Sequence, residues 1–234
     1  MTRPVLLDLY CGAGGASMGY YQAGFDVLGV DIAYQPHYPF RFERCDALTY
    51  LRTRNLDGIA AVHASPPCQR YSKMGACRPG LRATYPDLVA PTRASLIRTG
   101  LPYVIENVVE ADLRSPIFLC GLMFNRELYR HRLFECNFPI CQPSHPRHVV
   151  PASSPGKWKP GTVMTVVGHA APMKKAEQVM GIRWMTRDEL TEAIPPDYTK
   201  FIGKQLIAIK RLGDRNADPQ GNEAALPEEL AADQ

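Results

Sequence analysis

Long apolar runs are absent from this sequence of 234 residues, and no stretch approaches the length of a membrane-spanning helix. The N-terminus reaches Asp8 too early for a secretory signal, so we expect a cytoplasmic protein without a membrane partner. The seven cysteines are an odd number, which argues against a disulfide framework in that compartment. The question for each cysteine becomes whether it is a nucleophile or a metal ligand.

Charge is scarce and unevenly distributed. Charged residues make up 21% of the chain against 45% hydrophobic ones, a balance that supports a full core and excludes wholesale disorder. The net charge of +4 includes a tail, 213–234, with six acids and one base, which we predict to be disordered. Without it, 26 basic and 17 acidic residues leave +9 on residues 1–212. A basic body favours a polyanionic partner such as nucleic acid.

Apolar runs alternate with helical patterns through the first hundred residues, which predicts an α/β fold with a doubly wound, mostly parallel sheet. We expect strands at Val5–Tyr10, Phe25–Ile32, Gly58–Ala64 and Pro102–Val109, and helices at Ala16–Ala23 and Pro91–Arg98. An irregular, proline-rich insert follows at Asn137–Gly161. The later patterns predict helices at Lys174–Met180 and Arg187–Ala193, and a helix or helix–strand pair at Tyr198–Leu212.

Glycines follow the first predicted strand, in Asp8–Gly15. They allow a tight turn and the close approach of a ligand to the backbone. Their spacing fits neither the dinucleotide fingerprint nor the P-loop. Asp31 ends the second strand, where it could bind ribose hydroxyls, and Asp46 could accept from an adenine amine. The plain alternative is a strand–helix turn with two solvated acids.

A cysteine follows the third strand in Ser65–Ser72, where two prolines fix the backbone before Cys68. Catalytic groups gather at the carboxyl edge of parallel sheets, and the nearby Arg70 and Lys73 would favour a thiolate. The loop continues to Arg82 with basic residues and glycines that could close over a phosphate backbone. The alternative is a buried cysteine on a proline turn.

An acid, Glu106, lies inside the apolar strand that follows. A buried carboxylate needs a partner or a proton, and both suit a catalytic acid. Arg130 and Arg132 lie on one side of the chain if that segment is extended, where they could reach an anion or a carbonyl oxygen. The alternative for this pair is a solvated surface strand.

Together these motifs resemble, in order, those of the cytosine-5 DNA methyltransferases, particularly short phage-type members. The matching segments are the S-adenosylmethionine turn at Asp8–Gly15, the Pro-Cys-Gln motif at Ser65–Ser72, the Glu-Asn-Val motif at Glu106–Val108, the two arginines Arg130 and Arg132, and the last motif at Ala193–Leu206. The resemblance implies a Rossmann-like methyltransferase fold. It divides the chain into a catalytic core at 1–135, a small target-recognition lobe at 136–190, a returning segment at 191–212 and the tail.

The implied function is methyl transfer from S-adenosylmethionine to carbon 5 of a cytosine flipped out of double-stranded DNA. Cys68 would add to carbon 6, Glu106 would hydrogen-bond ring N3 and the amine, Arg132 would hold O2, and Arg130 would support them. The implied cofactor-binding residues are Asp8, Tyr10, Gly12, Gly14, Gly15, Asp31, Asp46, Pro67 and Lys204. The resemblance also implies a monomer in a bacterial or phage-infected cell, with any restriction partner left open.

Two departures from the family leave alternatives open. Leu128 replaces the glutamine that precedes the two arginines, so its hydrogen bond is lost or replaced. Lys204 replaces an asparagine near the transferable group, where a lysine would repel a sulfonium and pair with a carboxylate. Carboxy-S-adenosylmethionine is therefore an alternative donor, against a Lys204 that simply faces solvent or phosphate. A tRNA cytosine-5 methyltransferase would share the same motifs.

The lobe itself yields two expectations. About 55 residues separate the arginine pair from the last motif, which predicts a short or relaxed target sequence. Cys136, Cys141, His145 and His148 have side chains that suit zinc, but their spacing is tight for a standard finger. We assign no metal, and this run stays open.

Overall fold

The computed structural model describes residues 2–71 and 86–217, with only the backbone course for 211–217. A seven-stranded sheet runs through it in the order β3-β2-β1-β4-β5-β7-β6. All neighbours from β3 to β5 are parallel, while β7 runs antiparallel to both β5 and β6. The predicted α/β fold with a mostly parallel sheet is therefore confirmed.

The elements have the following bounds. The strands are β1 (Val5–Leu9), β2 (Asp26–Asp31), β3 (Arg41–Arg44), β4 (Ile59–Ala64), β5 (Tyr103–Asn107), β6 (Ile117–Leu119) and β7 (Arg132–Cys136). The helices are α1 (Gly15–Ala23), α2 (Ala47–Thr53), α5 (Val89–Thr99), α6 (Met173–Met180), α7 (Arg187–Glu192) and α8 (Pro196–Ala217), with a short 3-10 turn, η1, at Gly121–Phe124.

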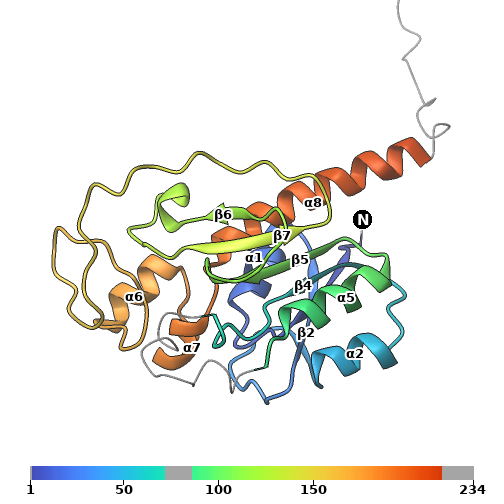
Figure 1. The fold of residues 1–234 in the computed structure, drawn as a ribbon, viewed down its shortest axis with the longest axis horizontal. Coiled ribbons are helices and arrows are strands. Elements are labelled where there is room, and N and C mark those ends of the chain that lie inside the picture. Colours follow the sequence, from blue (N-terminus) through green and yellow to red (C-terminus); the bar gives the residue numbers. More distant parts are fainter. Residues whose placement is uncertain (1, 72–85, 218–234) are drawn as a thin grey trace, which may run out of the picture.

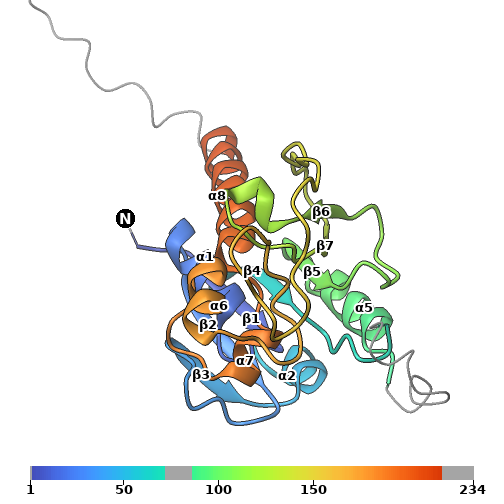
Figure 2. The ribbon, with the colours of Figure 1, turned by 90° about the vertical axis from the view of Figure 1, so that its left-hand side faces the viewer.

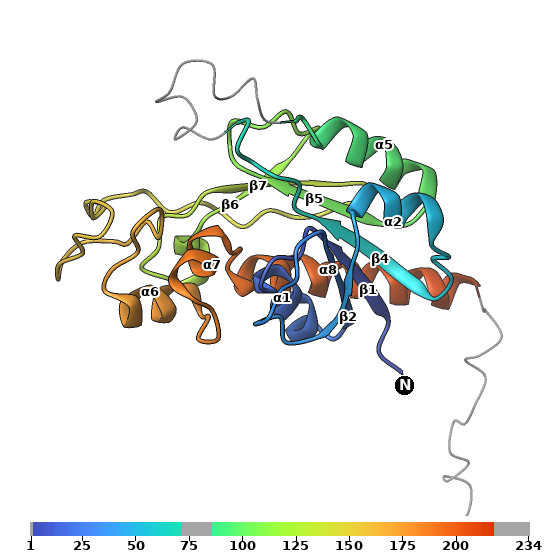
Figure 3. The same ribbon diagram turned by 90° about the horizontal axis from the view of Figure 1, so that it is seen from below.

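Helices cover both faces of the sheet, as Figures 1 and 3 show. Helices α1 and α8 pack on one face and α2 and α5 on the other. Neighbouring residues of a strand point to opposite faces, so Leu6 contributes to the first core and Leu7 to the second. Burial on both faces explains why these strands are continuous apolar runs rather than alternating ones.

Glycines bring α1 and α8 into close contact. A Cβ on Gly19 would lie 2.1 Å from the carbonyl oxygen of Pro196, and one on Gly203 would lie 2.8 Å from the Cβ of Ala23. The hydroxyl of Thr199 also donates to the carbonyl of Ala16 at 2.7 Å. The last segment of the chain is therefore fixed against the first helix, close to the glycine turn.

The structure differs from the sequence predictions in several elements. The short β3 and α2 were not predicted, and neither was the antiparallel pair β6–β7, of which only an extended arginine segment was expected. The final segment is one helix, which is one of the two alternatives expected for it, and it reaches Ala217, inside the tail predicted to be disordered. Residues 218–234 of that tail lie outside the described residues.

The segment 136–190 is largely irregular, apart from α6 and the start of α7, which lie side by side (Figures 1 and 2). Its apolar residues form a third core that includes Met164, Met180 and Ile182 and reaches Ala13 of the glycine turn. The indole N–H of Trp184 donates to the carbonyl of Ala13 at 2.9 Å. Among the described residues, no helix is long and apolar enough to cross a membrane.

Candidate active site

A cavity of about 400 Å³ opens at the carboxyl ends of β1, β2, β4 and β5. Such an edge is where ligands bind in open α/β sheets. The segments that line the cavity come from all parts of the chain: the glycine turn, the end of β2, the cysteine loop, β5, β7 and α7 with the residues after it. The predicted residues that line it are Tyr10, Gly12, Gly15, Asp31, Pro67, Cys68, Glu106 and Arg132.

The glycine turn has the backbone conformation that its sequence requires. Gly12 and Gly14 have φ angles of 49° and 87°, in the left-handed region that glycine adopts without strain. A Cβ on Gly12 would meet no atom within 4 Å, so the backbone there is open to a ligand. A Cβ on Gly15 would lie 2.5 Å from the carbonyl oxygen of Ile194, so α1 begins in contact with the segment after α7.

Asp31 is held at the end of β2 by backbone amides. Its carboxylate accepts from the N–H of Gly12 at 3.0 Å and from the N–H of Ala33 at 2.9 Å. The next residue, Ile32, also lines the cavity, although 67% of its surface is exposed. An acceptor beside an exposed apolar side chain suits a ligand that has both hydroxyl groups and a flat apolar face.

Cys68 lies in a loop whose backbone is fixed from β5. The side chain of Asn107 donates to the carbonyl of Pro66 at 2.9 Å, two residues before the cysteine. Burial raises the pKa of the half-buried Cys68 thiol, and the Glu106 carboxylate raises it further. Arg132 and Arg130 lower it, so these arginines supply the positive charge that the sequence analysis expected from the loop itself. Lys73 and Arg82 lie outside the described residues.

Glu106 is buried in β5, with 5% of its surface exposed. Its carboxylate accepts from Arg132 Nε at 2.9 Å and also interacts with the Ser65 side chain. Burial raises the pKa of Glu106 even though Arg132 and Ser65 lower it. A carboxyl that keeps a proton more readily than usual can donate it to a bound base.

A chain of buried polar groups stands behind Glu106. The Tyr20 hydroxyl lies 3.0 Å from His63 Nδ1, and His63 Nε2 lies 2.9 Å from the Ser65 hydroxyl. Burial lowers the pKa of His63 to about 3, so this ring is neutral. The sequence analysis did not identify His63 or Ser65, although a histidine inside the apolar run of β4 was an available signal.

Arg130 contributes to the site from outside the cavity. It is 98% buried, and it donates to the carbonyl of Val166 at 2.6 Å and to that of Thr191 at 2.7 Å. Burial lowers its pKa to about 9. These contacts join the segment just before β7 to Val166 of the irregular segment and to Thr191 of α7.

Besides Arg130, four residues predicted to bind the cofactor do not line the cavity. Asp8 is buried beneath the turn against Ser17, and Gly14 faces Tyr38 and Pro39. Asp46 accepts from the N–H of Thr49 at 2.8 Å as the N-cap of α2. Lys204 is exposed on α8. The structure therefore brings Cys68, Glu106 and Arg132 together at one cavity but leaves this part of the predicted cofactor set outside it.

Residues of α7 and its neighbourhood line the cavity without having been predicted. Glu189 lines it and pairs with His37 at 2.8 Å, which joins α7 to the loop after β2. Thr191, Glu192 and Ala193 line it as well. Such contacts between distant segments leave no local pattern in the sequence, so only the fold reveals them.

Comparison with known proteins points to methyltransferases. No protein-family profile matches the chain. The type II methyltransferase M.XorII of Xanthomonas oryzae pv. oryzae is 34% identical over 90 residues, which is 32% of this chain. The chain spans about a fifth of that curated relative, 21% of its length.

Solved methyltransferase structures resemble most of the chain in fold. A candidate DNA modification methyltransferase encoded within an E. coli prophage has a TM-score of 0.61 at 13% identity, over 88% of this chain and 99% of its own. The S. pombe Dnmt2 methyltransferase has a TM-score of 0.55 at 14% sequence identity, over 89% of this chain and 99% of its own. The Entamoeba histolytica methyltransferase EhMeth has a TM-score of 0.56 at 11% sequence identity, over 90% of this chain and 99% of its own. This chain therefore has the α/β fold that these solved methyltransferases share.

Proposed function

We propose that the protein is a DNA cytosine-5 methyltransferase that uses S-adenosylmethionine and forms a covalent adduct between Cys68 and the target cytosine. The observation that carries this proposal is convergence: Cys68, Glu106 and Arg132 come from three separate elements and line one cavity with the glycine turn. The matches to M.XorII and to the prophage enzyme support methylation of DNA as the activity.

The cavity suits a nucleoside-containing methyl donor. The open backbone at Gly12, the carboxylate of Asp31 and the exposed apolar side chain of Ile32 would hold the adenosine part. When bound, S-adenosylmethionine supplies an electrophilic methyl group on a sulfonium ion. Glu189 and Glu192 add negative charge to the lining, which favours a cationic donor.

The protein's own residues would activate the cytosine. The Cys68 thiolate forms a bond to carbon 6, and the electron pair of the 5,6 double bond moves toward N3, where Glu106 donates a proton. Carbon 5 thereby becomes the nucleophile that would take the methyl group, and the donor's sulfonium would leave as a neutral thioether. Loss of the carbon 5 proton to a base then allows the carbon–sulfur bond to break, which restores the 5,6 double bond and releases Cys68, and N3 returns its proton to Glu106. Arg132 holds the Glu106 carboxyl in place and would also donate to the cytosine O2.

The alternative donor finds no support in the geometry. Lys204 would have to face the transferable group to select a carboxylated donor, but it is exposed on α8 and does not line the cavity. We therefore propose methyl transfer rather than carboxymethyl transfer.

A trapping experiment tests the proposal. Random-sequence DNA duplexes that contain 5-fluoro-2′-deoxycytidine are incubated with S-adenosylmethionine and the full chain, because fluorine at carbon 5 blocks the release of Cys68. We expect a covalent protein–DNA band on a denaturing gel for the wild type, none for Cys68→Ser, and an unchanged band for the exposed control Cys141→Ser. Trapping of fluorinated tRNA but not of duplex DNA would assign the substrate to RNA. An adduct that persists in Cys68→Ser would refute the mechanism.

A further inference from the structure

Outside the cavity, one group of side chains has the composition of a metal site. Among the described residues, one group holds three or more side chains that could bind the same metal ion. Its members are Cys120, His131, His145 and His148. Their ligand atoms all lie within 4.8 Å of one another. None of the four lines the active-site cavity.

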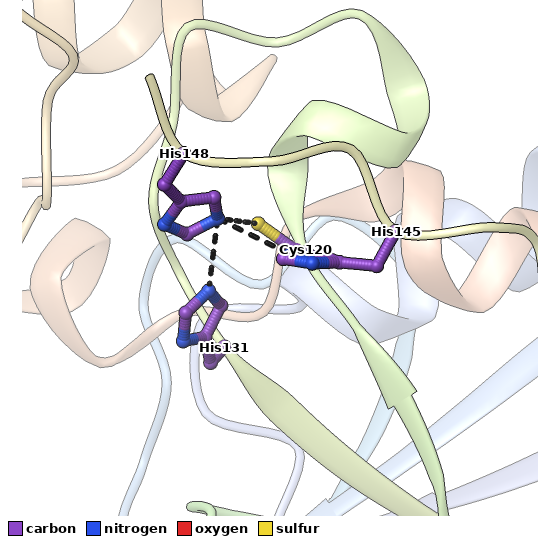
Figure 4. A group of neighbouring side chains, drawn as sticks. All are labelled: Cys120, His131, His145 and His148. Atoms are coloured by element: carbon purple, nitrogen blue, oxygen red, sulfur yellow. Dashed lines mark hydrogen bonds between the residues drawn. The ribbon is translucent and has the colours of Figure 1, made fainter. Parts of the chain in front are cut away.

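The fold brings two of the four together at the end of a strand pair. Cys120 directly follows β6 and His131 directly precedes β7, and the register pairs Leu119 with Arg132. The cysteine is fully buried, whereas the histidine is half-buried. The other two ligands, His145 and His148, come from the irregular segment that follows β7 and are exposed. Figure 4 shows the side chains of Cys120, His131 and His145 pointing toward one ring nitrogen of His148.

The three contacts of His148 Nε2 are close to the ligand spacing of a tetrahedral zinc site. His148 Nε2 lies 3.1 Å from His145 Nε2, 3.4 Å from His131 Nε2 and 3.5 Å from Cys120 Sγ. Bond lengths of zinc to nitrogen and sulfur place tetrahedral ligand atoms about 3.3 to 3.6 Å apart. The contacts of His148 with His131 and Cys120 already have this spacing, and the contact with His145 is slightly shorter.

Hydrogen bonding alone does not explain this arrangement. A neutral imidazole nitrogen either donates one proton or offers one lone pair in the ring plane, so His148 Nε2 cannot satisfy three neighbours at once. A cation at the centre would accept all four lone pairs together. Ring packing fixes the histidines in this orientation, since His148 stacks on Tyr129 with centroids 3.8 Å apart and Phe118 contacts both His131 and His145.

We propose that Cys120, His131, His145 and His148 bind one structural zinc ion. One sulfur and three imidazole nitrogens are ligands that zinc prefers over calcium or magnesium. Four protein ligands leave no open position, so the ion would be structural rather than catalytic. Binding converts the Cys120 thiol to a thiolate and releases its proton to solvent.

This ligand set differs from the run that the sequence suggested. His145 and His148 are shared, but Cys136 belongs to β7 and packs against the first core, while the backbone N–H of the exposed Cys141 bonds to Gln205 at 2.9 Å. The ion would fasten the segment that carries His145 to the β6–β7 pair. Because His131 lies between Arg130 and Arg132, it would also fix the backbone that supports both arginines.

Metal analysis of the full chain, purified without a polyhistidine tag and dialysed after incubation with zinc chloride, tests the proposal. We expect one zinc ion per chain in the wild type, loss of zinc in His145→Ala and in His148→Ala, and full retention in the controls His169→Ala and Cys141→Ala. The two histidine ligands are exposed, so their variants avoid the folding risk of a change at Cys120. A wild type that takes up no zinc, a His145→Ala variant that keeps it, or a Cys141→Ala variant that loses it would each overturn this site.

Cobalt substitution and proteolysis supply independent readouts. Cobalt(II) added to the metal-free wild type should give the visible absorption of a tetrahedral site with a thiolate charge-transfer band, and Cys120→Ser should lose that band. The fastening role predicts faster tryptic cleavage after Arg147 in His145→Ala than in His169→Ala. Equal cleavage rates would contradict that role, and an octahedral cobalt spectrum would contradict the ligand geometry.

Discussion

At the residue scale, Asp8 is a buried acid whose pKa is changed by its surroundings. It lies beneath the glycine turn with none of its surface exposed, and one carboxyl oxygen accepts from the Ser17 hydroxyl. Among the described residues, the other oxygen, Oδ1, has no hydrogen-bond partner. Burial, the largest cause, raises the pKa of Asp8 to about 7. The folded protein therefore holds a proton there at pH values where the unfolded chain has lost it.

This difference predicts a pH-dependent stability. The favourable effect of the protonated acid is complete below its ordinary pKa of 3.8 and is lost as the pH rises through about 7. Between those limits we expect the wild type to lose up to about 4 kcal/mol of unfolding free energy through this group. Asp8→Asn keeps an oxygen for Ser17 and cannot ionise, so its stability should fall less between pH 5 and 8.

Urea unfolding of both proteins across that range measures the effect. Asp26→Asn is the control, because its side chain is exposed on the same sheet and should follow the wild type. Parallel curves for the wild type and Asp8→Asn would show that the Asp8 carboxyl does not carry the proton.

The sequence predicted the site best at single residues whose local context is unusual. Glu106 stands out as an acid in an apolar strand, and Cys68 as a thiol fixed by prolines at a sheet edge. Both signals are local, and both residues line the cavity. The position of Asp46 after a strand was an equally local indication, but in the structure its carboxylate accepts a hydrogen bond from the first turn of α2. An acid after a strand suits a helix cap as well as a ligand, and the sequence does not separate the two uses.

At the element scale, a buried ion pair fastens α5 to β7. Arg93 donates to both carboxylate oxygens of Glu135, with Nε and Nη2 each 2.8 Å from the nearer oxygen. The two side chains are 7% and 3% exposed. The carboxylate also accepts from the backbone N–H of Arg114 at 2.8 Å. Because β7 carries Arg132, this pair helps to hold the strand that faces Glu106.

Loss of one partner should therefore be costly. We expect Arg93→Met to reduce the free energy of unfolding by about 3–5 kcal/mol, because Glu135 stays buried without its counter-charge. The double variant with Glu135→Met should recover part of this loss, since it removes both charges together. Arg98→Met, at an exposed position of the same helix, should change stability by less than about 0.5 kcal/mol. Denaturant unfolding measures the free energy of unfolding of each variant. A double variant that is less stable than Arg93→Met would show that the buried, unpaired Glu135 charge is not the cause of the loss.

The elements that the sequence missed share a physical cause. The parallel strands are buried on both faces, so their apolar runs are readable, whereas β3 has the sequence RFER and lies at the sheet edge. The antiparallel β7 has the sequence RLFEC, in which Glu135 is buried only because Arg93 meets it from α5. That pairing, like the lining of the cavity by α7, depends on contacts between distant segments.

At the scale of the whole molecule, the lobe uses much of its length to attach itself to the core. Its apolar residues pack with Leu128 and Ala13, and Trp184 bonds to the glycine turn. Arg130 reaches across to Val166 of the lobe. The start of α7 serves the cavity through Glu189. Under the proposed function, these attachments leave only a short segment to contact base edges in DNA.

A lobe of this size should read few bases, and this prediction rests on the proposed function. Less protein surface buried on DNA means fewer contacts to base edges, and each mismatched base pair typically costs only about 1–3 kcal/mol. We expect a short or relaxed target, seen by bisulfite sequencing of plasmid from cells that express the protein. Plasmid from cells that express Cys68→Ser gives the background of unconverted cytosine. A single strict motif of about six or more base pairs would mean that the lobe presents more base-reading side chains than its attachments allow.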